Sequence, residues 1–166
     1  RSSAASDVYK RQVIPYLGRT LSGVALMPYT EGVEGASLIY KMALPENVSE
    51  VNVHVVVKST LAFHDVKGHE YTVGFDGGKE TVVNFNADLN EESENVYSVF
   101  YPTVARRVVE KTVKLTVPPS TDGTQLLTLK PLDPGIVFEK IVVDCGGYQK
   151  SYLFMDESPC KRVLHR

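Results

Sequence analysis

The chain has 166 residues, of which 43% are hydrophobic and 23% are charged. This length and balance are those of one globular domain with a buried core, and they exclude an intrinsically disordered chain. The formal net charge is −2, there is no long basic run, and no apolar run approaches the length of a membrane span. We therefore expect neither nucleic acid nor a membrane as partner.

The beginning of the chain differs in character from its middle. Residues 1–12 are small, polar and basic and have no apolar centre, so they are not a secretory signal. They resemble translated sequencing-adaptor sequence, and we expect them to be a non-native leader. The domain itself is then expected to occupy residues 13–159, and residues 160–166 are expected to form a tail.

Alternation of apolar and polar residues is the main signal in the middle of the chain. The period of two and the many β-branched residues of segment 50–58 predict a half-buried strand, and segment 108–117 repeats the pattern. His54 is expected on the outward face of its strand, either exposed or facing another sheet. The side chains expected to point inward are Val51, Val53, Val55, Val57, Val109, Val113, Leu115 and Val117.

Shorter strands are predicted where apolar runs are bounded by turn residues. Asp76-Gly77 separates the runs 71–75 and 80–85 and predicts a hairpin with a type I′ turn, in which both central residues need positive φ. The acidic segment 87–99 is compatible with a helix or with a loop, and the alternative stays open. The remaining strands are predicted at 23–27, 37–44, 125–129 and 137–143.

These elements define the expected fold class. Seven to nine short strands at close spacing, with almost no helix, predict an all-β domain. The architecture that we expect is an antiparallel β-sandwich, jelly-roll-like in its connections.

The chain displays no pattern of residues that would carry catalysis. There is no Gly-x-Ser-x-Gly nucleophile motif, and no glycine-rich loop opens a helix to hold a phosphate. Glycoside hydrolysis needs two carboxyl groups across a cleft, whereas the acidic residues at 91–92, 122 and 156–157 lie in expected turns or tails. His64 and His69, with Asp65, are interpreted as solvated loop residues because their spacing is not that of a zinc site. We expect no catalytic residue, no metal and no cofactor.

Tyrosines are the weak candidates for sugar binding, because sugar rings stack on aromatic faces. The chain has nine Tyr, six Phe and no Trp. Tyr97 and Tyr101 lie in one segment with Phe100, and Tyr148 and Tyr152 flank the last expected turn. In a sandwich such residues are more often part of the core, so both interpretations stay open for Tyr97, Tyr101, Tyr148 and Tyr152.

The two cysteines, Cys145 and Cys160, are close enough in sequence for a disulfide that would close a short loop. Two unpaired thiols are the favoured interpretation, because a disulfide-rich scaffold would contain more cysteines.

Three stretches of the chain are similar, in order, to one known family. The first reads Ile-Pro-Tyr-Leu-Gly-Arg-Thr at 14–20 and Val-Ala-Leu-Met-Pro at 24–28. The second reads Tyr-Thr-Val-Gly-Phe-Asp-Gly-Gly at 71–78 and Val-Val-Asn at 82–84, and the third runs from Asp133 to Ser158. Together they resemble the first strand, the central hairpin and the closing strand and tail of the C-terminal β-sandwich domain of glycoside hydrolase family 115, the xylan α-glucuronidases.

The resemblance implies a context for the chain. The parent enzyme would be secreted or periplasmic and would remove 4-O-methyl-glucuronic acid from xylan side chains. Its catalytic acids belong to an upstream barrel, so no catalytic residue is carried over to this chain. The resemblance implies a non-catalytic accessory domain that packs on that barrel or on a dimer partner, and it predicts an exposed apolar face.

Two alternatives remain beside the accessory domain. A carbohydrate-binding module for glucuronoxylan predicts an exposed aromatic patch, with Tyr97, Tyr101, Tyr148 or Tyr152 lying coplanar. An enzyme in its own right predicts a cleft with convergent titratable groups.

Overall fold

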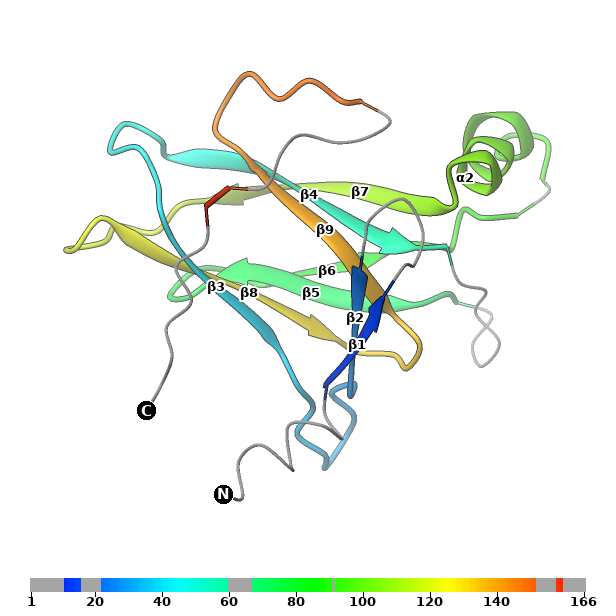
Figure 1. Cartoon of the computed structure of the whole chain (residues 1–166), viewed down its shortest axis with the longest axis horizontal. Helices are drawn as coiled ribbons and strands as arrows, with labels where there is room; N and C mark the ends of the chain where they lie inside the picture. Colours follow the sequence, from blue (N-terminus) through cyan, green and yellow to red (C-terminus); the bar gives the residue numbers. More distant parts are fainter. Residues whose placement is uncertain (1–10, 16–21, 60–66, 91, 152–157, 160–166) are drawn as a thin grey trace.

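The computed structural model describes residues 11–15, 22–59, 67–90, 92–151 and 158–159. Two antiparallel β-sheets pack face to face and form a sandwich, with a short helical segment at one end of it (Figure 1). The strands are β1 (Arg11–Pro15), β2 (Ser22–Leu26), β3 (Leu38–Ala43), β4 (Glu50–Lys58), β5 (Glu70–Phe75), β6 (Thr81–Asn84), β7 (Val108–Thr116), β8 (Thr124–Pro131) and β9 (Val137–Asp144).

The strand order is that of a jelly roll. One sheet has the order β1-β2-β9-β4-β7 and the other has the order β3-β8-β5-β6. The eight strands β2 to β9 therefore fall into two sheets of four, and β1 adds a fifth strand beside β2. The predicted all-β, jelly-roll-like sandwich is confirmed.

The core lies between the two sheets and follows from the alternation along the strands. Val51, Val53, Val55 and Val57 of β4 are buried, as predicted, and so are Val109 and Leu115 of β7. They face the residues that the second sheet contributes, and Val113 and Val117 pack against the same core at partial burial. The largest buried side chains of that second sheet are Tyr71, Val73, Phe75, Leu127 and Leu129.

All eight predicted strands are present within a few residues of their predicted bounds. β1 was not predicted, because its sequence Arg-Gln-Val-Ile-Pro does not alternate between apolar and polar residues. It begins at Arg11 and pairs with β2 along its whole length, so this strand starts inside the segment 1–12 that we expect to be a leader.

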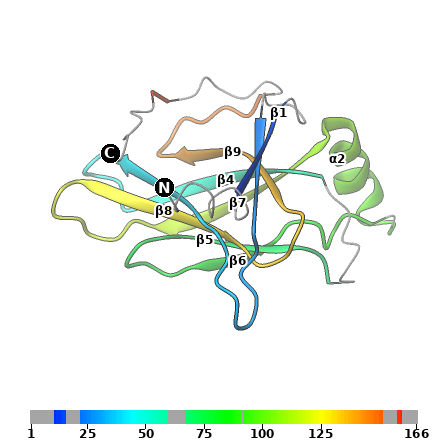
Figure 2. The ribbon, with the colours of Figure 1, turned by 60° about the horizontal axis from the view of Figure 1, so that its bottom comes forward.

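The helical residues begin within the last part of the acidic segment 87–99 and continue beyond it. A π-helical turn, η1 (Val96–Phe100), runs directly into the α-helix α2 (Tyr101–Arg106). Pro102 lies in the first turn of α2, where its missing N–H costs nothing. Most of segment 87–95 forms turns. In Figure 2 the helical segment lies beside the start of β7, at the edge of the five-stranded sheet.

The predicted hairpin between β5 and β6 is confirmed, but its turn type is not. The amide of Gly78 donates to the carbonyl of Phe75, and Gly77 has φ of 75°. Within the described part of the chain, Arg107 is the one non-glycine residue with positive φ, so Asp76 has negative φ. Positive φ at the second central residue alone is the geometry of a type II turn, not of type I′.

The chain folds back on itself after β9. Segment 145–151, here called the C-terminal segment, returns over the outer face of the five-stranded sheet (Figure 1). Tyr148 packs on His54 of β4, and Lys150 forms an ion pair with Glu110 of β7. Residues on the nominally solvent-facing side of this sheet are therefore partly covered.

Candidate functional site

The helical segment presents an exposed apolar surface. Tyr97, Tyr101 and Val104 are 80%, 55% and 57% exposed, and their spacing of four and three residues places them on one side of the segment. The rings of Tyr97 and Tyr101 lie 5.8 Å apart between centroids, at an angle of 36°. We call these three residues the helix surface.

Phe100 supports this surface from behind. Its ring meets the edge of the Tyr101 ring at a centroid distance of 5.8 Å and an angle of 74°, and it is only half-buried. Three aromatic rings are therefore in contact within one short segment, two of them largely exposed.

Tyr148 does not join the helix surface. Tyr148 is half-buried in the C-terminal segment, with its ring 4.6 Å from the ring of His54. Tyr152 lies outside the residues that the structure describes. The structure brings together Tyr97 and Tyr101, and it separates Tyr148 from them.

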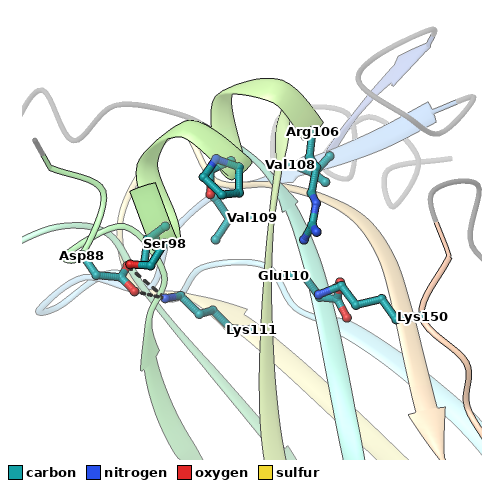
Figure 3. A pocket seen from close by; sticks show the side chains of 11 residues that line it. Asp88, Ser98, Arg106, Val108, Val109, Glu110, Lys111 and Lys150 are labelled. Carbon is teal, nitrogen blue, oxygen red and sulfur yellow. Dashed lines mark hydrogen bonds and ion pairs between the residues drawn. The ribbon is translucent and has the colours of Figure 1, made fainter. Parts of the chain in front are cut away.

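A polar pocket lies under the opposite side of the helical segment (Figure 3). It has a volume of about 220 Å³ and is lined by η1 and α2, by Asp88, by the first residues of β7 and by Lys150 of the C-terminal segment. Its charged lining residues are Asp88, Arg106, Glu110, Lys111 and Lys150.

Both carboxylates of this pocket are already bound to lysines. The Nζ atom of Lys111 donates to the two carboxylate oxygens of Asp88 at 2.9 and 2.7 Å. Lys150 lies 2.7 Å from Glu110. Arg106 extends from α2 toward Glu110 and Lys150 in Figure 3, yet it forms no ion pair with any carboxylate of the described residues.

Glu110 connects this pocket to His54. The Glu110 side chain is only 9% exposed although it points away from the core, and its second oxygen lies 3.2 Å from Nδ1 of His54. The same Nδ1 lies 2.9 Å from the hydroxyl of Thr112. His54 is on the outward face, as predicted, but it is 14% exposed because Tyr148 covers it.

The prediction of solvated loop histidines is wrong for His69. This residue is 4% exposed and packs against Phe85 at a ring distance of 5.8 Å. Its backbone N–H donates to the side-chain oxygen of Asn86, which follows β6 and closes over it. His64 and Asp65 lie outside the described residues. The described residues contain no group of three or more His, Cys, Asp or Glu that could hold a metal ion.

Among the turn carboxylates that the structure describes, Asp122 does not have the environment of a catalytic acid. Asp122 is exposed and accepts hydrogen bonds from the hydroxyl of Thr124, from its N–H and from the hydroxyl of Ser120. These bonds, with the charge of Lys41, hold the pKa of Asp122 well below its usual range, so it stays ionised and cannot act as a general acid at neutral pH. Glu91, Asp156 and Glu157 lie outside the described residues.

Cys145 is an exposed free thiol. Partial burial, followed by the charge of Asp144, raises its pKa above the ordinary value, so it is a weak nucleophile at neutral pH. Cys160 lies outside the described residues, and its unpaired state stays a prediction.

Comparison with known families decides what kind of domain this is. The family model described as the glycosyl hydrolase family 115 C-terminal domain matches residues 1–157. The chain belongs to this family. The matching model is that of the C-terminal domain and not of the catalytic domain, and the resemblance seen in the sequence is confirmed.

A solved structure supports the fold of this family 115 C-terminal domain. The structure is described as a novel family GH115 4-O-methyl-α-glucuronidase with specificity for decorated arabinogalactans. The TM-score is 0.61 at 18% sequence identity, over 81% of this chain and 16% of that enzyme. The chain thus spans about a sixth of the length of the enzyme that it resembles. The comparison with curated proteins gave no match.

No helix in the described part of the chain combines the length and the hydropathy of a membrane span.

The sequence did not predict the charged residues that line the polar pocket. Arg106, Lys111 and Lys150 come from three separate elements, and the one local signal was the Arg106-Arg107 pair after an apolar segment.

Proposed function

We propose that this family 115 C-terminal domain is a non-catalytic accessory domain that packs, through its helix surface, against the rest of a glucuronidase of the family. The observation that carries the proposal is the exposure of Tyr97, Tyr101 and Val104 on one side of a helical segment. Exposed aromatic residues gathered in one place are typical of interfaces.

The proposed occupant of this surface is the catalytic part of the same enzyme. The similar domain in the solved glucuronidase accounts for 16% of a much longer chain, so a large partner is covalently present in such enzymes. The pocket carboxylates are each neutralised by a lysine, which favours a binding or structural role for this domain over catalysis. The parent enzyme would act on a glucuronate-decorated polysaccharide outside the cytoplasm, in secreted or periplasmic form.

Cooperative unfolding of the full-length enzyme tests this docking. The wild-type enzyme is expected to unfold with this domain and its neighbour in one calorimetric transition. The double variant Tyr97→Ala/Tyr101→Ala is expected to separate the transition of this domain from that of the neighbour, because the buried aromatic area is lost. The isolated chain with the same substitutions serves as control and is expected to keep its melting temperature, since both side chains are exposed in it.

Independent unfolding of this domain in the wild-type full-length enzyme, at the melting temperature of the isolated chain, would contradict docking. Self-association of the isolated chain that the double variant abolishes would instead assign the helix surface to a second copy.

A carbohydrate-binding module for glucuronoxylan is the second candidate, and the exposed Tyr97–Tyr101 pair favours it. The 36° angle between the two rings counts against it, because the module predicts coplanar rings. Calorimetric titration of the isolated chain with glucuronoxylan oligosaccharides, and with undecorated xylo-oligosaccharides as control, separates the two candidates. Selective binding in the micromolar to millimolar range that Tyr97→Ala abolishes would favour the module. No heat, or binding that Tyr97→Ala leaves unchanged, would favour docking through the helix surface.

A further inference from the structure

Among the described residues, one cation of the polar pocket under α2 has no carboxylate partner. Three cations, Arg106, Lys111 and Lys150, face two carboxylates, Asp88 and Glu110, so the lining has one positive charge in excess. Each lysine is bound to one carboxylate, which leaves Arg106 as the excess charge within the described residues. Its guanidinium extends toward the side of the pocket that Lys150 closes (Figure 3).

We propose that this pocket binds a carboxylate-bearing sugar, a hexuronate, with its carboxylate on Arg106. One excess charge fits a monoanion better than a dianionic phosphate. The planar guanidinium fork offers two parallel N–H donors, which match the two oxygens of a carboxylate.

The remaining lining suits a hydroxylated ring. An ammonium group has three N–H donors. Lys111 directs two hydrogen bonds to Asp88, and Lys150 contacts Glu110 with one short distance. Both lysines keep a donor for a sugar hydroxyl, and the carboxylates and Thr103 can accept from hydroxyl groups. Pro102 and Val99 supply an apolar wall on which the C–H face of a sugar can pack.

The size of the pocket limits the ligand. Its volume of about 220 Å³ is below the range of about 300–1,000 Å³ that is usual for drug-sized ligands. One terminal uronate with the rest of its chain in solvent fits this volume, whereas an internal stretch of polysaccharide does not. The site lies on the side of the helical segment opposite Tyr97 and Tyr101, so it is independent of the docking proposal.

A titration followed by ¹H–¹⁵N NMR on the whole chain tests the inference, at constant ionic strength. D-glucuronate is expected to shift the amides around the pocket saturably, with a dissociation constant on the order of 1 mM. D-glucose, which carries a neutral CH₂OH group in place of the carboxylate, and inorganic phosphate are expected to bind at least tenfold more weakly. A further titration uses a xylo-oligosaccharide that carries a terminal glucuronate. If it binds more tightly than free glucuronate, the site is assigned to a polysaccharide side chain. If the two bind equally, the site is assigned to the free acid.

Two adjacent arginines provide a matched control. Arg106→Gln is expected to weaken glucuronate binding at least tenfold, and Arg106→Lys to weaken it by a smaller factor because the charge stays but the fork is lost. Arg107→Gln removes the same charge outside the lining and is expected to leave binding unchanged. The NMR spectra also report whether each variant is folded.

The inference is overturned by any of four results. These are no saturation up to tens of millimolar glucuronate, equal binding of glucose, binding of phosphate at least as tight as that of glucuronate, and unchanged binding in Arg106→Gln. None of them bears on docking, which the unfolding of the full-length enzyme tests separately.

Discussion

The hydroxyl group of Tyr71 is a polar group buried in an otherwise apolar part of the core. The residue is fully buried between the sheets, with its ring edge-on to Phe138 at 5.5 Å. Its hydroxyl has no hydrogen-bond partner among the described residues, and desolvation raises the pKa of the phenol well above its usual range. A buried hydroxyl without a partner lowers stability, because its hydration is lost and not replaced.

Replacement of Tyr71 by Phe is therefore expected to raise the free energy of unfolding, by about 1 kcal/mol. The ring and its packing stay, and only the unpaired oxygen is removed. Urea denaturation at neutral pH measures the effect. A loss of stability of more than about 1 kcal/mol would contradict the expectation, because it would mean that the hydroxyl has a partner that it needs.

Asp122 predicts a pH dependence of stability. Hydrogen bonds from Thr124 and Ser120 lower the pKa of this carboxyl in the folded chain. A group whose pKa falls on folding stabilises the protein at pH values above its unfolded pKa, and this contribution is lost as the pH falls through the folded pKa. Wild type is therefore expected to melt at a higher temperature than Asp122→Ala at pH 7, with a difference that begins to shrink below about pH 3.8. A difference that stays constant down to pH 2 would show that the carboxylate charge has no part in it.

At the scale of elements, the end of α2 is shaped by an unusual residue. Arg107 has φ of 61° and its amide donates to the carbonyl of Thr103 at 2.8 Å. This left-handed residue ends the helix and directs the chain into β7, and Arg106, the last residue of α2, lines the pocket. Glycine is the usual residue at such a position, because a side chain there is strained by about 1–2 kcal/mol.

Arg107→Gly is accordingly expected to stabilise the domain by about 0.5–1 kcal/mol, since relief of strain exceeds the entropy that glycine adds to the unfolded chain. Arg106→Gly is the control: this neighbour is helical, and the substitution is expected to lower stability by about 1 kcal/mol. Chemical denaturation of both variants gives the comparison. If both substitutions destabilise alike, the left-handed conformation of Arg107 carries no strain.

The elements also show how far sequence reasoning reaches. Strands such as β4 and β7 were predictable, because alternation over nine residues reflects one buried face. The turn type at Asp76-Gly77 was not predictable, because an Asp-Gly dipeptide is compatible with both a type I′ and a type II turn, and the type II turn needs positive φ only at Gly77. The burial of His69 was missed, because Asn86, which lies 17 residues further along, closes over it. The pocket was missed for the same reason, since its charges converge only after folding.

At the scale of the whole molecule, Glu110 connects three distant parts of the chain. It belongs to β7, pairs with His54 of β4 and binds Lys150 of the C-terminal segment. The segment after β9 is thereby attached to the outer face of the five-stranded sheet, with the Tyr148 ring packed at a tilt against His54. The stability of this attachment depends on a carboxylate that is only 9% exposed, where screening by solvent is weak.

Glu110→Gln is expected to lower the free energy of unfolding by about 1–3 kcal/mol, because two charge-assisted contacts of a nearly buried group are lost together. Glu50→Gln is the matched control. Glu50 also pairs with a lysine on the outer face of the same sheet, Lys114 at 2.6 Å, but its side chain is 51% exposed, so its loss is expected to change stability by no more than about 0.5 kcal/mol. Urea denaturation of the two variants, with hydrogen exchange at residues 146–151, distinguishes local from global effects. Faster exchange in this segment for Glu110→Gln alone supports the attachment; equal losses in the two variants would mean that Glu110 is no more than another surface charge.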